Sequence, residues 1–197
     1  MFKVILIDNA GVLINTDCIS FYKKLVRHSP YSLQHITRYI EDRDFHIMET
    51  GRISSKEWYK IICKKFKINI TYEWFKKEWV KIFYRNKPME KFVRKNYKKI
   101  RIWMLTNSNS VHYPYLKRKF PIYNFIKNKV VSFKIRMAKP DKNIYRYTLK
   151  KLKLKPEECL FIDNKRANIT TANKLGINCI WYRDFNQFKR ELKKFEI

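Results

Sequence analysis

The stretch FKVILIDNAGVLIN, residues Phe2–Asn15, decides the fold. Its apolar run predicts a short buried strand that ends on Asp8, and Gly11 follows within a turn. The whole chain has only 17 acidic residues and 3 glycines, so one of each at this strand end is a marked concentration. Because ligands bind outside the carboxyl ends of the strands in an open parallel sheet, Asp8 is the first candidate functional residue.

Further short apolar segments predict more buried strands, at residues 100–106, 130–133, 159–163 and 179–182. Segments of helical period alternate with these strands, and one of them carries an apolar stripe through Ile144, Thr148 and Leu152. This alternation predicts an α/β fold in three layers, with a parallel sheet covered by helices on both faces.

The first crossover is too long for a single helix, because residues 16–88 separate the first strand from the approach to the second. Within it, Trp58, Ile62 and Phe66 form an apolar stripe at helical spacing, and a second stripe includes Trp79. We therefore predict a helical cap over residues 16–88, inserted after the first strand, and a core made of residues 1–15 and 89–197.

The charge balance is strongly positive. The chain has 45 Lys and Arg against 17 Asp and Glu, which leaves a formal net charge of +28. A field of this sign favours a polyanionic partner, either nucleic acid or an anionic membrane surface. The alternative is a genomic bias in composition that enriches lysine without a functional consequence.

Basic side chains gather on several of the predicted helices, and those between residues 56 and 67 lie opposite the apolar stripe of Trp58. The sequence contains no RNP motif, KH loop, helix-turn-helix or zinc finger, so sequence-specific readout is not predicted. The candidate nucleic-acid-binding residues are Lys56, Lys60, Lys64, Lys67, Lys98, Lys99, Lys117, Arg118, Lys119, Lys142, Arg146 and Lys150.

The 4 cysteines lie far apart, with no CxxC pair and no histidine at metal-ligand spacing. This pattern predicts neither a zinc site nor a disulfide framework, and it favours a reducing intracellular setting, either the cytoplasm or a mitochondrial or other organellar matrix. No apolar run approaches the length of a membrane span and no signal peptide is visible, so no membrane anchor is predicted. We expect His28, His35, His46 and His112 to be surface or packing residues.

Polar residues follow the predicted strand ends in a fixed order, as Asp8-Asn9-Ala10-Gly11-Val12, Leu105-Thr106-Asn107-Ser108, Lys139-Pro140-Asp141, and Asp163-Asn164 with Asn168. In order and spacing these residues resemble the four motifs of the haloacid dehalogenase-like (HAD) hydrolase superfamily, and the similarity covers nearly the whole chain. The stretches MLTNSNS, AKPDKNIY, FIDNKRANITTANKLGI and ETGRISSKEW look closest to a small sugar-phosphatase-like branch with a helical cap. The resemblance implies a HAD-like Rossmannoid fold.

The resemblance also implies a phosphatase chemistry in which an aspartate attacks phosphorus. Asp8 matches that nucleophile, Thr106 matches a hydroxyl that hydrogen-bonds the phosphoryl oxygens, and Lys139 matches the lysine that neutralises their charge. Asp8, Asp163 and Asn164 match the positions that hold Mg²⁺.

Two positions depart from the family pattern. Ala10 stands where an aspartate usually protonates the leaving oxygen, a proton transfer typically worth about 10²- to 10⁴-fold in rate. Asn164 stands where an aspartate usually binds magnesium directly. Because a neutral amide brings no charge to the metal, we expect Mg²⁺ binding to be weakened.

The incomplete motifs and the basic surface together predict a catalytically degenerate HAD-like protein, a pseudoenzyme that serves as an RNA-binding structural component of a ribonucleoprotein. The expected setting is a mitochondrial or other organellar ribosome, with ribosomal RNA and neighbouring subunits as partners. Asp8, Lys139 and Asp163 would then persist as a buried ion cluster. The alternative is a Mg²⁺-dependent HAD phosphatase that acts on a small phosphorylated metabolite through an aspartyl-phosphate intermediate.

Overall fold

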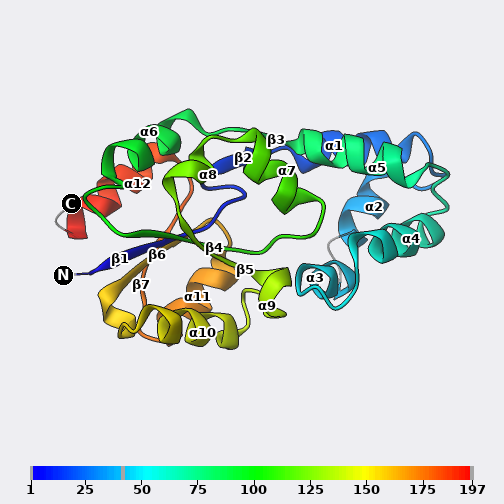
Figure 1. Ribbon diagram of the computed structural model, residues 1–197. Coiled ribbons are helices and arrows are strands. Elements are labelled where there is room, and N and C mark those ends of the chain that lie inside the picture. The colour runs from blue at the N-terminus through cyan, green and yellow to red at the C-terminus, as the bar shows by residue number, and fades with distance from the viewer. Residues whose placement is uncertain (1, 41–42, 196–197) are drawn as a thin grey trace.

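The computed structural model describes residues 2–40 and 43–195, and it contains a five-stranded parallel sheet at its centre (Figure 1). The strand order is β5-β4-β1-β6-β7, and every neighbouring pair is parallel. The strands are β1 (Val4–Ile7), β4 (Ile102–Thr106), β5 (Asn128–Val131), β6 (Cys159–Asp163) and β7 (Asn178–Trp181). The predicted α/β fold class with a parallel sheet is confirmed.

The third predicted strand, at residues 130–133, is displaced along the chain. Strand β5 ends at Val131, and the next residues form the short helix α9 (Ser132–Ile135). The Ser132 hydroxyl accepts a hydrogen bond from the Ser108 backbone N–H at 3.0 Å and donates one to the Glu49 carbonyl oxygen at 2.6 Å. These two contacts explain why the chain leaves the sheet at Ser132, since they tie it to segments outside the strand ladder.

Helices cover both faces of the sheet, with α6 (Lys87–Asn96) and α12 (Phe185–Leu192) on one side and α10 (Lys142–Leu152) and α11 (Arg166–Lys174) on the other (Figure 1). Because side chains alternate along a strand, Ile5 and Ile7 of β1 belong to one hydrophobic cluster, whereas Val4 and Leu6 belong to another. The sheet is therefore buried on both faces, as its continuous apolar strands predict.

The segment that follows β1 forms a mostly helical cap. An antiparallel pair, β2 (Ile14–Thr16) and β3 (Phe83–Arg85), connects it to the core. Its helices are α1 (Cys18–Val26), α2 (Leu33–Tyr39), α3 (Arg43–Glu49), α4 (Ser55–Lys65), α5 (Tyr72–Trp79) and the 3₁₀ turn η1 (Val80–Ile82). The division of the chain at residues 15/16 and 88/89 stays a prediction.

Local sequence signals explain where the cap helices begin. Ser54 and Glu57 form a capping box at the start of α4, in which the Ser54 hydroxyl accepts from the Glu57 N–H at 3.1 Å and the Glu57 carboxylate accepts from the Ser54 N–H at 2.6 Å. Helix α4 then buries Trp58 and Ile62, as its apolar stripe predicts. The Trp58 ring stacks on Trp79 of α5 with a centroid separation of 4.9 Å.

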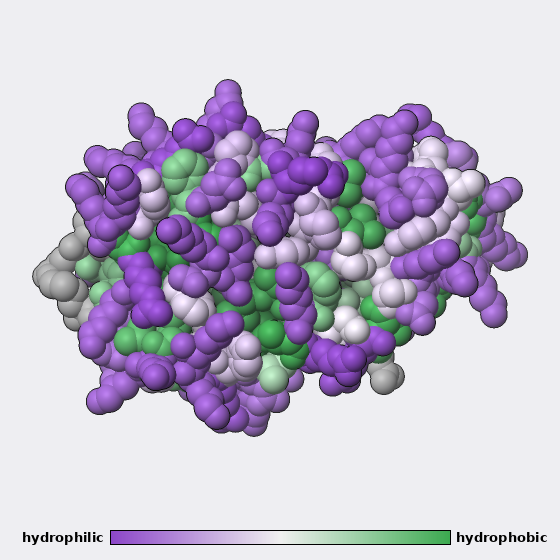
Figure 2. Space-filling model, in the orientation of Figure 1, coloured by the Kyte–Doolittle hydropathy of each residue, from purple (hydrophilic) through white to green (hydrophobic). Residues whose placement is uncertain are grey.

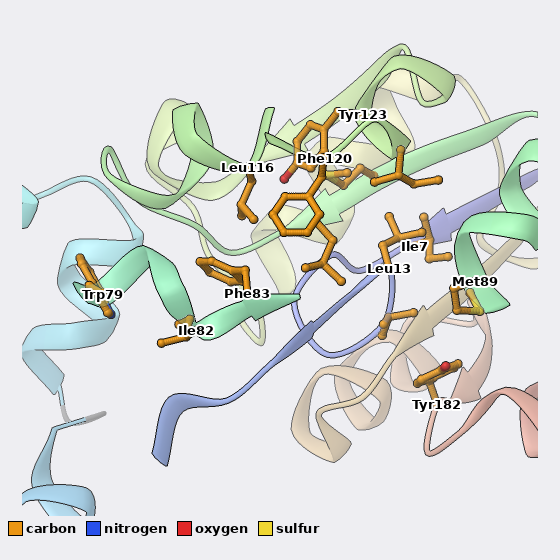
Figure 3. Packing of buried hydrophobic residues seen from close by; sticks show 14 of the residues in the cluster. Ile7, Leu13, Trp79, Ile82, Phe83, Met89, Leu116, Phe120, Tyr123 and Tyr182 are labelled. Atoms are coloured by element: carbon orange, nitrogen blue, oxygen red, sulfur yellow. The ribbon is translucent and has the colours of Figure 1, made fainter. Parts of the chain in front are cut away.

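Cap and core share one continuous hydrophobic cluster. Figure 3 shows Ile82 and Phe83, at the end of the cap, packed close to Leu116 of the core helix α7 (His112–Lys119). The same cluster continues to Phe120 and Ile7 on the face of the sheet that α6 and α12 cover. Shared burial of this kind holds the cap against the carboxyl ends of the strands.

The remaining elements are short, namely α8 (Ile122–Phe125), η2 (Pro156–Glu158) and η3 (Lys193–Phe195). Within residues 2–40 and 43–195, no helix has the length and apolar character needed to cross a bilayer.

Candidate active site

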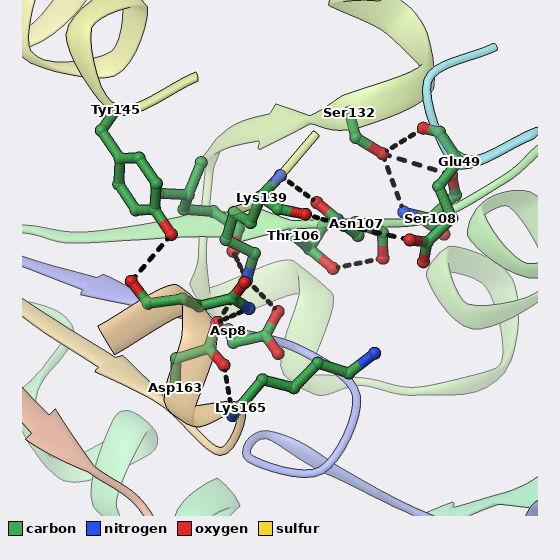
Figure 4. A network of polar contacts seen from close by, with 12 residues as sticks. Asp8, Glu49, Thr106, Asn107, Ser108, Ser132, Lys139, Tyr145, Asp163 and Lys165 are labelled. Atoms are coloured by element: carbon green, nitrogen blue, oxygen red, sulfur yellow. Dashed lines mark hydrogen bonds and ion pairs between the residues drawn. The ribbon is translucent and has the colours of Figure 1, made fainter. Parts of the chain in front are cut away.

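The sheet brings the predicted strand-end residues together at one edge (Figure 4). Asp8 follows β1 directly, and its backbone N–H donates to the Ile162 carbonyl oxygen at 2.9 Å, which sets it beside Asp163 at the end of β6. Thr106 ends β4 on the other side of β1, where Ile7 pairs with Met104. Neighbouring parallel strands end at the same edge, so residues far apart in the sequence meet here.

Lys139 is the centre of this cluster. Its Nζ lies 2.8 Å from Asp8 Oδ1 and 2.6 Å from Asp163 Oδ2, and it donates to the Leu105 carbonyl oxygen at 2.8 Å (Figure 4). Lys139 is 2% exposed. Burial alone would lower the pKa of Lys139, but the carboxylates of Asp163 and Asp8 outweigh it, so the pKa lies above its ordinary value. The lysine therefore carries a positive charge inside the protein.

The two carboxylates in the cluster have different surroundings. Asp163 is fully buried and accepts three hydrogen bonds: Oδ1 accepts from the Lys165 N–H at 2.7 Å, and Oδ2 accepts from Asn168 Nδ2 at 2.9 Å and from Lys139 Nζ at 2.6 Å. Burial raises the pKa of Asp8 to about 6, although the charge of Lys139 opposes the shift. Asp8 is thus the carboxylate whose ionisation depends on what occupies the site.

Asn107 links the cluster to the cap. Its Oδ1 accepts from the Lys139 backbone N–H at 2.9 Å, and its Nδ2 donates to the Lys139 carbonyl oxygen at 2.9 Å. The same Nδ2 donates to Glu49 Oε2 at 3.0 Å. The neighbouring Thr106 is fully buried, and its hydroxyl donates to the Asn107 carbonyl oxygen at 3.0 Å. A hydroxyl held at this strand end is a donor that can turn towards a phosphoryl oxygen.

The turn after β1 places Gly11 against Asn164. Gly11 has a φ of +87°, and a Cβ at this position would lie 2.7 Å from Asn164 Cγ, so only glycine fits. Asn164 Oδ1 is buried and has no hydrogen-bond partner among the described residues. An unpaired buried oxygen next to the strand ends is a feature that a bound cation would satisfy.

The oxygen atoms of Asp8, Asp163 and Asn164 are the donors that a magnesium ion prefers. Within the described parts of the chain, no group of three His, Cys, Asp or Glu side chains is arranged to hold a metal. Because Asn164 supplies a neutral oxygen in place of a third carboxylate, the donor set fits a hard divalent cation but carries less negative charge.

A cavity of about 170 Å³ lies between the cap and this edge of the sheet. The core side of the cavity includes Asn9, Ala10 and Asn164 from the turns after β1 and β6. The cap side is largely aromatic and apolar. The cap residues that line it are Thr16, Cys18, Tyr22, Phe45, Glu49, Trp79, Ile82 and Phe83.

Sequence reasoning missed two residues of this cavity. Glu49 stands in the segment ETGRISSKEW, which indicated a cap but gave no signal for the role of its glutamate. His112, expected to be an ordinary surface or packing residue, lines the cavity at 8% exposure. Burial lowers the pKa of His112 to about 3, so its ring is neutral.

The hydrogen bonds of His112 leave one ring nitrogen unused. Nδ1 lies 3.2 Å from Asn109 Nδ2, which can only donate, so Nδ1 accepts and the proton sits on Nε2. Nε2 is buried and has no partner within the described chain. The site therefore holds an unused donor as well as the unused acceptor of Asn164.

The basic residues predicted to bind nucleic acid are all exposed, and hydrophilic side chains cover most of the face shown in Figure 2. They do not gather in one place, since α4 and α6 lie at opposite ends of the molecule in Figure 1. Lys56, Lys60 and Lys64 lie on α4, and Lys67 follows it. Lys98 and Lys99 follow α6, Lys117, Arg118 and Lys119 lie on α7, and Lys142, Arg146 and Lys150 lie on α10.

A parallel sheet with an inserted cap, and a buried aspartate–lysine cluster at its strand ends, are the features of one class of hydrolase. Residues 2–176 match the family described as haloacid dehalogenase-like hydrolase, and the chain belongs to this family.

Curated relatives include enzymes with several activities. The chain is 21% identical to D-ribitol-5-phosphate phosphatase of Bacteroides thetaiotaomicron, over 98% of this chain and 97% of that protein. It is 20% identical to drimenol cyclase drtB of Aspergillus calidoustus over 98% of its own length but 36% of the cyclase. It is 37% identical to bifunctional epoxide hydrolase 2 of Rattus norvegicus over 33% of its length, which is 12% of that enzyme. The chain thus spans a minor part of the latter two proteins.

Solved structures agree with this assignment. A HAD family enzyme from Bacteroides thetaiotaomicron, in complex with magnesium and inorganic phosphate, has a TM-score of 0.79 and 25% identity, covering 93% of this chain and 95% of that one. A HAD-like hydrolase from Porphyromonas gingivalis has the same fold, with a TM-score of 0.75 and 23% identity over 91% and 90% of the two chains. Magnesium is therefore a cofactor found in this family.

These findings correct the leading functional prediction. The expectation of a degenerate pseudoenzyme that acts as a structural, RNA-binding component of a mitochondrial or organellar ribosome is wrong, because the full-length relatives are phosphatases and HAD enzymes. The predicted partners, ribosomal RNA and neighbouring ribonucleoprotein subunits, are wrong for the same reason. The error came from inferring a polymeric partner from the net charge and from the two departures in the motifs, whereas the relatives that match the whole chain point to an enzyme.

Proposed function

We propose that the protein is a phosphoric monoester hydrolase that removes phosphate from a small phosphorylated metabolite through an aspartyl-phosphate at Asp8. One observation carries the proposal. A buried carboxylate, Asp8, is held by the Lys139 ammonium group and directly precedes Asn9 and Ala10, which line the cavity between cap and core. This arrangement occurs in a chain that is similar over 98% of its length to a phosphatase.

The residues around Asp8 supply what attack on a phosphate ester requires. A carboxylate and a phosphate repel each other unless positive charge and fixed donors offset the repulsion. Lys139 is charged, buried and in contact with Asp8 Oδ1, so it orients the carboxylate and leaves the other oxygen to attack phosphorus. The Thr106 hydroxyl lies at the neighbouring strand end and would hydrogen-bond a phosphoryl oxygen. Lys139 contacts Asp8 before any substrate binds, whereas the Thr106 hydroxyl would turn from the Asn107 carbonyl oxygen to the phosphoryl group.

Mg²⁺ would be held by oxygen atoms of Asp8, Asp163 and Asn164, and when bound it would offset the charge on the phosphoryl oxygens. Asp163 is positioned for this by Lys165 and Asn168. Because Asn164 brings no charge, we expect a lower affinity for magnesium than a site with an aspartate there would have.

The size and lining of the cavity support a small substrate. A volume of about 170 Å³ favours a small substrate, such as a short polyol or sugar phosphate, over a larger one such as a nucleotide. The unused N–H of His112 Nε2 can donate to a substrate hydroxyl, while the ring of Trp79 would pack on the carbon chain. A polyol phosphate is our first candidate, because one full-length relative is a D-ribitol-5-phosphate phosphatase.

The net charge of +28 has a role in this proposal without a polymeric partner. A positive field around the protein raises the local concentration of anionic phosphate esters and speeds their encounter with the site. The expected sign is a kcat/KM that falls as salt is added, while kcat changes little.

The test is phosphate release from a panel of polyol and sugar phosphates, with and without Mg²⁺. We expect Mg²⁺-dependent turnover that Asp8→Asn lowers by at least about 10³-fold, because the amide cannot form the aspartyl-phosphate. Asp17→Asn is the matched control, since Asp17 caps α1 at the surface and asparagine caps equally well. Turnover that survives in Asp8→Asn, or no turnover on any member of the panel, would refute the proposal.

A further inference from the structure

The core of this site lacks an acid where its chemistry needs one. Ala10 lines the cavity two residues after Asp8 and has no proton to give or take. Breaking a phosphate ester leaves an alkoxide that must be protonated, and the water that hydrolyses an aspartyl-phosphate must lose a proton. Some other group in the cavity has to serve both needs.

The cap brings a carboxylic acid to this cavity. Glu49, the last residue of α3, lines the cavity together with Ala10, Asn107 and Lys165. Figure 4 shows its side chain reaching from the cap towards the strand ends. Of the Asp and Glu side chains in the described chain, it is the only one among the residues that line this cavity.

Contacts with residues of the core hold Glu49 in place. Its Oε2 accepts from Asn107 Nδ2 at 3.0 Å, and its carbonyl oxygen accepts from the Ser132 hydroxyl at 2.6 Å. Gly51 keeps the following turn against the core, where a Cβ would lie 2.5 Å from the Phe133 carbonyl oxygen. Asn107 is itself fixed by two hydrogen bonds to the Lys139 backbone, so the carboxyl of Glu49 is tied to the residue that holds Asp8.

We propose that Glu49 is the acid–base residue of this site and supplies from the cap the proton transfer that position 10 cannot. The inference rests on the proposed function, since it names the residue that completes that reaction. It makes the cap a direct participant in the chemistry as well as a cover over the cavity.

The two half-reactions balance with one proton. In the first, Asp8 Oδ2 forms a bond to phosphorus, the phosphorus–oxygen ester bond breaks, and the leaving oxygen takes the proton of neutral Glu49 and departs as an alcohol. In the second, a water oxygen attacks phosphorus, Glu49 takes the proton that this water loses, and Asp8 leaves as a carboxylate. Inorganic phosphate is released, and Glu49 is neutral again.

The charges around Glu49 suit this exchange. Lys165 in the loop after β6 and Lys139 before α10 are the cations that act on its carboxyl, and Asp8 after β1 is the opposing anion. His112 of α7 also lines the cavity but is neutral, and Asp44 and His46 lie on α3 itself. Burial dominates and raises the pKa of Glu49 to about 7, so both protonation states are populated near neutral pH.

The experiment compares Glu49→Gln with the wild type on two classes of substrate. Glutamine keeps the hydrogen bond from Asn107 but cannot transfer a proton. Hydrolysis of an alkyl phosphate such as ribitol phosphate should fall by about 10²- to 10⁴-fold, because its alkoxide needs an acid. The phenolate of p-nitrophenyl phosphate leaves without being protonated, so the rate of the first step in Glu49→Gln should stay within about tenfold of the wild-type rate.

The same variant should reveal the second role of Glu49. Loss of the base slows hydrolysis of the aspartyl-phosphate, so Glu49→Gln mixed with p-nitrophenyl phosphate should release one rapid equivalent of p-nitrophenol. Intact mass spectrometry should then find one added phosphoryl group per chain, absent after Asp8→Asn. Placing an acid in the core, as Ala10→Asp in the Glu49→Gln protein, should restore turnover of the alkyl phosphate.

Controls separate this inference from the proposed function. Glu73→Gln removes an exposed carboxylate from α5 of the cap, outside the cavity, and should leave both substrates unaffected. Turnover in the wild type that Glu49→Gln does not change would overturn the role of Glu49 and leave the phosphatase standing. An equal fall on both substrates with no trapped phosphoenzyme would overturn it too. If Glu49→Gln does not fold, the Glu49→Ala variant is used instead. Recovery of alkyl phosphate hydrolysis on adding formate would support the acid–base role of Glu49, and no recovery would overturn it.

Discussion

Lys139 offers the sharpest test of how this site is built. The Lys139→Met variant keeps the length of the side chain and removes the charge that sits between two buried carboxylates. Asp8 and Asp163 would then face each other at 7% and 0% exposure without the cation that now lies 2.8 and 2.6 Å from them. The variant therefore measures what the ion cluster contributes to folding.

The expected cost follows from the burial of the cluster. Removing one partner of a buried ion pair costs about 3–5 kcal/mol, because it leaves an uncompensated buried charge. With an m-value of about 2.5 kcal/mol per molar urea, this cost shifts the unfolding midpoint down by about 1–2 M. The shift should be measured by far-ultraviolet circular dichroism at pH 7.5 in a magnesium-free buffer.

The pH dependence identifies the cause of the loss. Without Lys139 the carboxylates are stabilised by protonation, so the difference in unfolding free energy between variant and wild type should shrink by at least about half at pH 5. Lys142→Met is the control, because Lys142 is exposed at the start of α10, and its effect should stay within about 0.5 kcal/mol. The reasoning is refuted if Lys139→Met has the midpoint of the wild type at pH 7.5, or loses as much stability at pH 5 as at pH 7.5.

Three further outcomes follow from the same geometry. The pKa of Asp8 is about 6 in the folded protein and 3.8 when the side chain is free in water. Protonated Asp8 therefore adds to the free energy of unfolding below about pH 4, and this contribution is lost as the pH rises through 6. Magnesium affinity, which needs ionised Asp8, should fall up to about tenfold per pH unit below 6 by calorimetry, and a pH-independent affinity would contradict this. Asn164→Asp adds a third carboxylate, so it should tighten Mg²⁺ binding by about tenfold or more and lower the melting temperature of the metal-free protein. Weaker Mg²⁺ binding in this variant would contradict the proposed position of the metal. Gly11→Ala should cost about 1–3 kcal/mol in urea unfolding, because φ is +87° and the new Cβ meets Asn164, and an unchanged midpoint would exclude that clash.

The sheet and its functional edge could be predicted from local patterns. Apolar runs that end on Asp8, Thr106 and Asp163 are signals that each strand carries by itself, and a parallel sheet must bring such ends to one side. The cap was predictable because the first crossover is too long for one helix. The end of β5 was not, since the turn at Ser132 depends on hydrogen bonds to Ser108 and Glu49, which are remote in the sequence.

The functional prediction erred where it relied on composition. A net charge of +28 says how much charge the chain carries but not where that charge lies, and the lysines of α4 and α6 prove to be at opposite ends of the molecule. The sequence predicts that an acid is missing at Ala10, but a one-dimensional pattern shows only what a motif lacks. It cannot show what another part of the chain brings to the same place.

The sequence alone indicated the buried strands of a parallel sheet, the cluster of Asp8, Lys139 and Asp163, and the family to which they point. These follow from periodicity and from the common direction of parallel strands, which act locally. Tertiary structure alone decided that Glu49 and the unpaired nitrogen of His112 meet over the same cavity. Their meeting depends on the hydrophobic contact that closes the cap onto the core, a property of two packed surfaces that no single stretch of residues encodes.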